Sequence, residues 1–232
     1  MSRNLDSALP KSEMTPKDVG FPYLWVDAAD STKRILNTSN ELIGVVDKSA
    51  FGKYFEQSVP GAASHPSATV LGSKGAFTTT AINGLFGRAI SMPLTEVTMF
   101  FVYDGNDGTL LESEAEGLVV SDAAITVGSA TGAAPAKLSD ADTHVLMVYW
   151  DAASGELWYK FDEDAKVLLD TDTTRLTLGV DDMYLMNTDG DNNGVTGTVG
   201  EIIMYPTKLP VFQMNRVGKY LCTKWNALWS DV

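Results

Sequence analysis

Three carboxylates at alternate positions, Glu112, Glu114 and Glu116, have types and spacing that suggest acid–base chemistry. Alternate residues of a β-strand point to the same face, so a strand here would line all three side chains along one groove. Retaining cleavage of a glycosidic bond needs two carboxyls about 5–5.5 Å apart. The Cα atoms of Glu112 and Glu116 would lie roughly 13 Å apart on an ideal strand. The competing interpretation is a solvated acidic strand face in a chain that is acidic throughout.

A second pattern, Asp189-Gly190-Asp191-Asn192-Asn193-Gly194, matches the start of a calcium-binding loop. Oxygen ligands stand at positions 1, 3 and 5 and glycine at position 6, as Ca²⁺ loops require. Gly200 occupies the twelfth position, where a bidentate Glu is expected. The pattern therefore predicts either Ca²⁺ held by Asp189, Asp191 and Asn193 or a polar turn between strands. The chain has no phosphate-binding glycine loop or zinc motif, so we expect no other cofactor.

Aromatic side chains that can stack on a sugar ring gather around one predicted hairpin, at Tyr149, Trp150, Trp158 and Tyr159. Strand alternation places some of these rings in a core and others outside it. Trp229, near the end of the chain, is the better candidate for an exposed contact.

The histidines and the cysteine offer little for catalysis. His65 stands in a loop rich in Pro, Gly, Ala and Ser, and His144 stands at the entrance to a strand, where we expect a structural role. The single cysteine, Cys222, excludes an internal disulfide and a cysteine-built zinc site. It falls near an apolar helix stripe, which predicts a buried, inert thiol.

Charge excludes several classes of partner. The 232 residues include 17 Lys and Arg against 30 Asp and Glu, which gives a net charge of −13. Such a surface repels phosphate backbones and anionic lipids, so no nucleic acid and no membrane partner is expected. No apolar run approaches the roughly 20 residues of a membrane helix, and the first residues do not resemble a secretion signal.

Most of the chain consists of short apolar runs separated by Asp- and Gly-rich turns. The strongest runs cover residues 23–26, 97–103, 145–150, 157–161, 175–180 and 201–205. Many short strands with few intervening helices predict an all-β sandwich, and a single domain covering residues 21–232 is a normal size for one.

The two ends of the chain differ from this pattern. Residues 1–20 are polar, contain Pro10 and Pro16, and predict an extended N-terminal arm that needs something to hold it. Near the other end, Val217, Leu221, Trp225 and Leu228 recur at intervals of three or four. That spacing predicts an α-helix over residues 210–228 whose apolar stripe packs on the sandwich.

Several ordered segments together resemble the concanavalin A-like, laminin-G-type jelly-roll family. The first two match its Leu-Trp-x-Asp-Ala opening and its Asp-Lys-Ser-Gly-x-Gly turn, with Ala50 replacing the first glycine of that turn. The others resemble its Asn-Gly-Leu approach, its last strand and its Tyr-Leu-x-x-Lys-Trp helix. The segments, in the family's order, are residues 24–30, 46–52, 82–85, 197–205 and 220–225.

The resemblance implies a concanavalin A-like β-sandwich with an N-terminal arm and a C-terminal helix. It leaves function open, because this sandwich occurs in lectins, glycan-binding modules, glycoside hydrolases and virion or surface-layer proteins. Laminarinase-like relatives use Glu-x-Asp-x-Glu on one strand as nucleophile, helper and general acid. Here Glu114 replaces the middle Asp, and no aromatic residue flanks the segment.

Our leading hypothesis is a non-catalytic structural or adhesion module on the surface of a bacteriophage particle. The protein would be made in the host cytoplasm without a signal peptide and attached through residues 1–20 to a major capsid or tail protein, or to a second copy of itself. The alternative is a lectin-like module that binds host polysaccharide. A hydrolase that uses Glu112 and Glu116 is the third reading.

Overall fold

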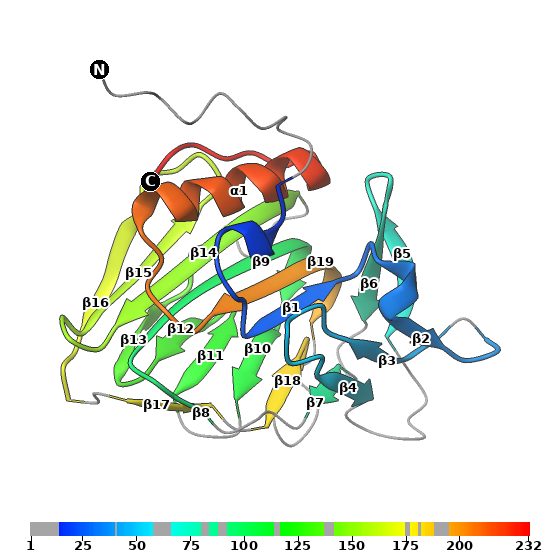
Figure 1. Cartoon of the computed structure of the whole chain (residues 1–232), viewed down its shortest axis with the longest axis horizontal. Coiled ribbons are helices and arrows are strands. Elements are labelled where there is room, and N and C mark those ends of the chain that lie inside the picture. The colour runs from blue at the N-terminus through cyan, green and yellow to red at the C-terminus, as the bar shows by residue number, and fades with distance from the viewer. Residues whose placement is uncertain are drawn as a thin grey trace.

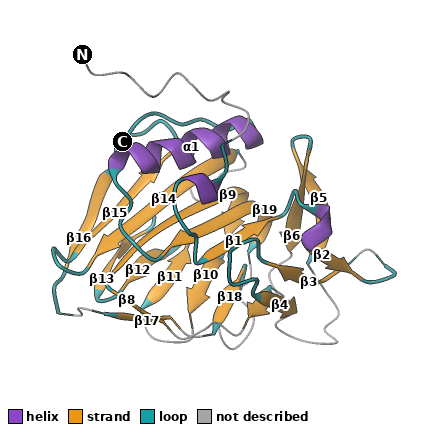
Figure 2. Cartoon of the chain, in the orientation of Figure 1, coloured by secondary structure: helices purple, strands orange, loops and turns teal. Residues whose placement is uncertain are grey.

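The computed structural model describes residues 14–39, 41–57, 66–79, 84–87, 92–113, 117–136, 142–174, 177–180, 182–187 and 195–232. Two antiparallel sheets stack face to face, and a single helix, α1 (Val211–Trp225), lies across the outer face of one of them (Figures 1 and 2). The predicted all-β sandwich with a C-terminal helix is therefore confirmed.

The first sheet has eight strands and lies beneath the helix. Its order is β16 (Val167–Thr171), β15 (Glu156–Phe161), β14 (Thr143–Asp151), β9 (Glu96–Asp107), β19 (Thr196–Tyr205), β6 (Lys74–Thr79) and β5 (Ser67–Leu71), with β1 (Leu24–Asp27) also paired to β19.

The second sheet has nine strands within the described residues, and the chain also contains short elements outside both sheets. Its order is β13 (Ala130–Ala133), β12 (Ala124–Val127), β11 (Leu118–Ser121), β10 (Thr109–Ser113), β18 (Met183–Leu185), β7 (Leu85–Gly87), β4 (Tyr54–Gln57), β3 (Leu42–Val46) and β2 (Arg34–Leu36). The short elements are the pair β8 (Met92–Leu94) and β17 (Leu178–Val180) and the 3₁₀ turns η2 (Pro16–Asp18) and η3 (Ser31–Lys33).

Strand β14 explains why some runs in the sequence are apolar without a break. Leu146, Val148 and Trp150 point into the core between the sheets. Val145 and Met147 point the other way, into a second apolar cluster beneath α1. A strand that is buried on both faces needs apolar side chains at every position, so its sequence loses the usual alternation.

The helix α1 is shorter than the sequence predicted. Met214, Val217, Leu221 and Trp225 form its buried stripe, as predicted. The helix stops because Asn226 takes the left-handed conformation (φ 55°), and Leu228, expected on the stripe, lies beyond the end and is 57% exposed. Neither this helix nor any other in the described part of the chain has the length and hydropathy to cross a bilayer.

A buried carboxylate joins α1 to the sheet. Glu201 of β19 is 1% exposed, and its two oxygens accept four hydrogen bonds from side chains. The donors and distances are Trp25 Nε1 (2.6 Å), Tyr220 Oη (3.1 Å), Lys224 Nζ (2.7 Å) and Trp225 Nε1 (2.8 Å). Burial raises the pKa of Glu201, and the ammonium of Lys224 opposes that shift.

A second acid extends this network to the strand β1. Asp27 accepts a hydrogen bond from Lys224 Nζ at 2.6 Å and another from Lys48 Nζ at 2.8 Å. The charges of Glu201 and Lys224, taken out of water, are therefore balanced inside one connected cluster. We call Trp25, Asp27, Lys48, Glu201, Tyr220, Lys224 and Trp225 the buried ion network.

The turn that follows β3 is held by a second buried acid. Asp47 accepts hydrogen bonds from the backbone amides of Ser49 and Lys53. The ammonium of Lys53 donates to the carbonyl of Tyr23 at 2.7 Å and lies 3.0 Å from the centre of that ring. Burial lowers the pKa of Lys53 to about 8, although the nearby charge of Asp47 raises it.

Part of the expected N-terminal arm lies against the body of the sandwich. The hydroxyl of Tyr205 donates to the carbonyl of Pro16 at 2.9 Å, Lys17 lies over the Trp25 ring, and Val19 is buried. Residues 1–13 lie outside the described residues, so the division into an arm of residues 1–20 and a sandwich of residues 21–232 stays a prediction.

We predict that Lys224→Met destabilises the protein by about 3–5 kcal/mol, because it leaves the buried carboxylate of Glu201 without its cation. Denaturant unfolding measures this change. Lys219→Met on the same helix is the control: its pair with Asp231 is exposed, so we expect about 1 kcal/mol or less. Equal losses in the two variants would contradict a dominant role for the network.

We predict that Lys53 makes stability increase with pH. Its pKa is about 8 in the folded state and ordinarily 10.5, so folding releases its proton between these values. The free energy of unfolding of the wild type, relative to Lys53→Met, should therefore rise from pH 8 to pH 10.5.

Lys48 supplies the control for this measurement. Burial acts to lower its pKa, but its ion pairs with Asp27 and Asp30 outweigh burial and raise it. Lys48 is therefore protonated in both states below about pH 10, and the difference between wild type and Lys48→Met should stay constant there. A flat profile for Lys53→Met would refute the assigned shift.

Candidate functional site

The hairpin of β14 and β15 separates its four aromatic residues by face. Trp150 is fully buried in the core between the sheets. Tyr149 and Trp158 face each other across the two strands, in the antiparallel register, on the outer face of the sheet. Their rings are nearly parallel, with an interplanar angle of 12° and centroids 6.1 Å apart. The predicted division of the aromatic residues between the core and the outer face is therefore confirmed. Tyr149 and Trp158 lie side by side on the outer face, next to the start of α1.

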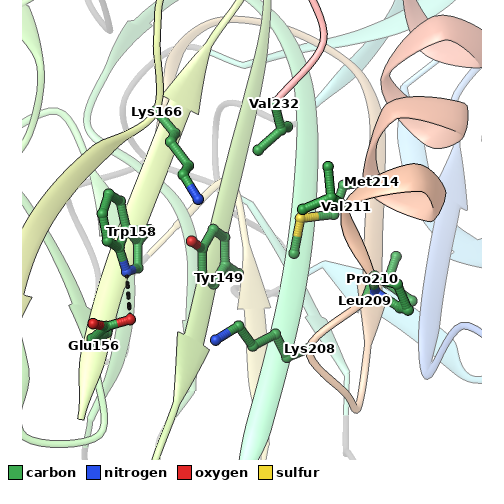
Figure 3. A pocket seen from close by; sticks show the side chains of 10 residues that line it. All are labelled: Tyr149, Glu156, Trp158, Lys166, Lys208, Leu209, Pro210, Val211, Met214 and Val232. Atoms are coloured by element: carbon green, nitrogen blue, oxygen red, sulfur yellow. Dashed lines mark hydrogen bonds between the residues drawn. The ribbon is translucent and has the colours of Figure 1, made fainter. Parts of the chain in front are cut away.

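These two rings form the floor of a hollow of about 340 Å³, which lies within the size range of small-molecule sites. The opposite wall comes from the segment that enters α1 and from its first turn (Figure 3). The lining residues are Tyr149, Glu156, Trp158, Lys166, Lys208, Leu209, Pro210, Val211, Met214 and Val232, and we call this hollow the aromatic groove.

Charged side chains stand at both ends of the aromatic groove. Lys166 Nζ lies 4.8 Å from the centre of the Trp158 ring, at one end (Figure 3). At the other end, Glu156 Oε2 accepts a hydrogen bond of 3.0 Å from the indole N–H of Trp158. Lys208 is held there by Asp151 Oδ2 at 3.1 Å. The groove therefore has an apolar floor with a positive end and a mixed, hydrogen-bonding end.

The Tyr149 hydroxyl is a hydrogen-bond donor inside the groove. Burial, together with the negative charges of Glu156 and Asp151, raises the pKa of Tyr149 to about 12. The hydroxyl therefore keeps its proton at neutral pH. Within the described part of the chain no hydrogen bond contributes to the pKa of this hydroxyl, and its oxygen is not among the buried polar atoms left without a partner. A bound polar molecule can accept a hydrogen bond from this hydroxyl.

The groove combines aromatic, hydrogen-bonding and charged side chains. Its floor suits the apolar face of a sugar ring, and Lys166, Lys208 and Glu156 can exchange hydrogen bonds with hydroxyl groups. Glu156 is the one acidic side chain among the described residues that line it. Glycoside hydrolysis ordinarily uses two carboxyls, one on each side of the bond.

The candidate acid Glu112 lies far from this groove, on the outer face of the second sheet. It pairs across β10 and β18 with Tyr184, which pairs in turn with Phe86 of β7. The rings of Tyr184 and Phe86 lie 5.0 Å apart. Glu114 and Glu116 lie outside the described residues, so the geometry of three carboxylates in one row stays untested.

The predicted calcium ligands Asp189, Asp191 and Asn193 also lie outside the described residues, so Ca²⁺ binding there stays a prediction. Among the residues that the structure does describe, no three His, Cys, Asp or Glu side chains gather closely enough to hold a metal ion.

The prediction that Trp229 is an exposed contact is wrong. The residue is 9% exposed, and its ring centroid lies 6.2 Å from that of Phe100. The ring fits against α1 because Gly218 has no side chain: a Cβ there would lie 2.0 Å from the indole. The ammonium of Lys160 also contacts this indole and lies 4.7 Å from the centre of the Trp229 ring. The signal in the sequence was Gly218, because a glycine in the middle of a helix indicates close packing of another side chain against it.

The remaining candidates have structural environments. His144 Nδ1 lies 2.6 Å from Asp162 Oδ2 at the start of β14, which agrees with the structural role expected for it. Cys222 is half-buried, and burial raises the pKa of its thiol, which disfavours the reactive thiolate. His65 lies outside the described residues.

Sequence reasoning missed the charged residues of the groove. Lys166 precedes β16, and Lys208 stands between β19 and α1, about forty residues further on. Neither belongs to a motif. The pairing of β15 with β16 brings Lys166 beside Trp158. The contacts of Lys208 with Asp151 and Glu96 hold it beside Tyr149.

Comparison with known proteins identifies the fold and no family. No protein-family model matches the chain, and no curated protein does. Solved structures match at a TM-score of 0.54 for a GH54 α-L-arabinofuranosidase (11% identity, covering 82% of this chain and 52% of that chain). Domain 4 of AbnA, a GH43 extracellular arabinanase from Geobacillus stearothermophilus in complex with arabinotriose, matches at 0.53 (12% identity, 85% and 97% covered). The ligand-binding domain of botulinum neurotoxin serotype D, in complex with N-acetylneuraminic acid, matches at 0.53 (12% identity, 84% and 53% covered).

At these identities the likeness shows the fold alone. The protein has a two-sheet antiparallel β-sandwich fold, which it shares with these structures. It spans about half the length of the arabinofuranosidase and neurotoxin chains and nearly all of the arabinanase domain.

Proposed function

We propose that this protein is a non-catalytic, lectin-like module that binds a glycan in the aromatic groove. The observation that carries the proposal is the pair of nearly parallel rings, Tyr149 and Trp158, at the floor of a hollow with hydrogen-bonding groups at both ends. A sugar presents an apolar face of C–H groups and a polar rim of hydroxyls, and the groove offers a matching surface for each.

The side chains of the groove are held in place before any ligand arrives. Glu156 fixes the indole of Trp158 through its N–H. Lys208 is fixed twice, by Asp151 through its ammonium and by Glu96 through its backbone amide at 3.1 Å. A site whose groups are already ordered loses less entropy on binding, which favours affinity for a small ligand.

The structural neighbours support the same class of function. Domain 4 of the arabinanase was solved with arabinotriose, and the serotype D toxin domain with N-acetylneuraminic acid. Each of these structures contains a bound sugar in a chain that matches this fold over all or part of its length. We propose a non-catalytic role because a single acid, Glu156, lines the groove and is already engaged by Trp158.

We predict that Trp158→Ala lowers glycan affinity at least about tenfold, since stacking on an aromatic ring and hydrogen bonding at the groove end are lost together. Glycan-array screening of the wild type, followed by calorimetry on the best ligand, measures the change. Phe21→Ala is the matched control, because that ring is 82% exposed and lies outside the groove. Equal affinities of wild type and Trp158→Ala would exclude this site.

We also propose that the module is carried on a bacteriophage particle, where its N-terminal arm attaches it to a capsid or tail protein. The observation in favour is the anchored segment that follows residues 1–13. Pro16 is held by Tyr205, and Arg216 Nε of α1 lies 2.9 Å from Met14 Sδ. If residues 1–13 bind a particle protein, the fixed position of the segment that follows them would hold the whole domain close to that particle.

We predict that deletion of residues 1–13 leaves the thermal unfolding temperature unchanged, because the contacts of Pro16 and Val19 remain. The same deletion should abolish incorporation into particles, measured by the protein content of purified virions. Deletion of residues 1–20 is the comparison, since it also removes these contacts and should lower the unfolding temperature. Normal incorporation of the shorter deletion would refute attachment through the arm.

A further inference from the structure

We propose that the aromatic groove selects sugars that carry a carboxylate, which Lys166 and the Tyr149 hydroxyl bind together. This inference rests on the proposed glycan-binding function and adds the chemical class of the ligand. It concerns one end of the groove, where the two donors meet (Figure 3).

Two hydrogen-bond donors lie close together at that end, and the ammonium of Lys166 contacts aromatic rings rather than an acid. Lys166 Nζ lies 4.8 Å from the centre of the Trp158 ring and 6.0 Å from that of Tyr149. Figure 3 shows the ammonium and the Tyr149 hydroxyl on the same side of the groove. Within the described residues Lys166 forms no ion pair, and no hydrogen bond is among the causes of the pKa shift of Tyr149. A carboxylate has two acceptor oxygens, so it can accept from both donors at once.

The other two charged side chains of the groove, Lys208 and Glu156, do not compete with Lys166 for a bound carboxylate. Lys208 is neutralised by Asp151 at 3.1 Å. Glu156 stands at the far end of the Trp158 ring, where its carboxylate receives the indole N–H. Lys166 is therefore the uncompensated cation of the site, and the separation from Glu156 gives the groove a positive and a negative end.

This polarity sets the orientation of a bound ring. The carboxylate would face Lys166 and the Tyr149 hydroxyl, the C–H face would lie on the half-buried ring of Trp158, and hydroxyl groups would point to Glu156 and Lys208. A preference for acidic sugars cannot come from the protein as a whole, because its net charge of −13 repels anions. Any such preference must arise from a local group.

The test uses pairs of glycans that differ in their charge: trigalacturonic acid with its methyl ester, and sialyllactose with lactose. Calorimetry on the wild type should give an affinity for the acidic member at least about tenfold higher, as expected for a charge-assisted hydrogen bond. Lys166→Met should reduce this ratio to near one, because it weakens binding of the acidic member far more than binding of the neutral one. Tyr149→Phe should reduce the ratio severalfold.

Lys74→Met is the control for loss of one positive charge. Lys74 is exposed and opens β6, near the opposite edge of the same sheet, so its replacement should keep the ratio of the wild type. A ratio unchanged by Lys166→Met, or equal binding of acidic and neutral sugars by the wild type, would overturn this inference and leave the proposed function standing. Failure of the wild type to bind any of the four glycans would overturn both.

Discussion

The carboxylate of Glu201 is the group on which the arrangement of the outer layer depends. A charge removed from water is tolerated only when it is paired and hydrogen-bonded, and here four donors from β1 and α1 converge on one side chain of β19. Trp25 comes from the strand, and Tyr220, Lys224 and Trp225 come from the helix. Apolar packing alone allows a helix to slide on a sheet, because it has no direction. The buried ion network removes that freedom, since each displacement would leave a charge or an indole N–H unpaired.

The same constraint reaches the groove through the helix. Leu209 and Met214, which line the groove, belong to the apolar cluster that also contains Trp225 of the network. The backbone amide of Leu209 donates to Thr98 Oγ1 at 3.0 Å, so the segment entering α1 is tied to β9. The wall opposite Tyr149 is therefore held by hydrogen bonds at the helix entrance and by ion pairs near its end. Binding groups carried on such fixed elements keep their geometry better than groups carried on loops.

Much of the fold follows from the sequence because strands and helices leave local signals. The hairpin of β14 and β15, the all-β class and the stripe of α1 come from periodicity and turn residues, which depend on near neighbours. The groove does not, because its lining comes from segments far apart in the sequence, namely β14, β15, Lys166 and the entrance to α1, which lie together only in the folded chain. The wrong prediction for Trp229 has the same origin: an aromatic residue near the end of a chain looks exposed until a slot such as that at Gly218 accepts it.

The residues that carry the family resemblance and the residues that suggest binding are different sets. Trp25, Asp27, Glu201 and Lys224 hold the outer layer together, so any protein that keeps this architecture has a reason to keep them, whatever it binds. Tyr149, Trp158 and Lys166 lie outside those motifs and contribute a surface rather than a scaffold. This separation explains why the resemblance indicates the fold and leaves the ligand open. The ligand specificity of such a sandwich depends on the side chains on its faces. The backbone fixes where those side chains point, but it does not fix which amino acids they are.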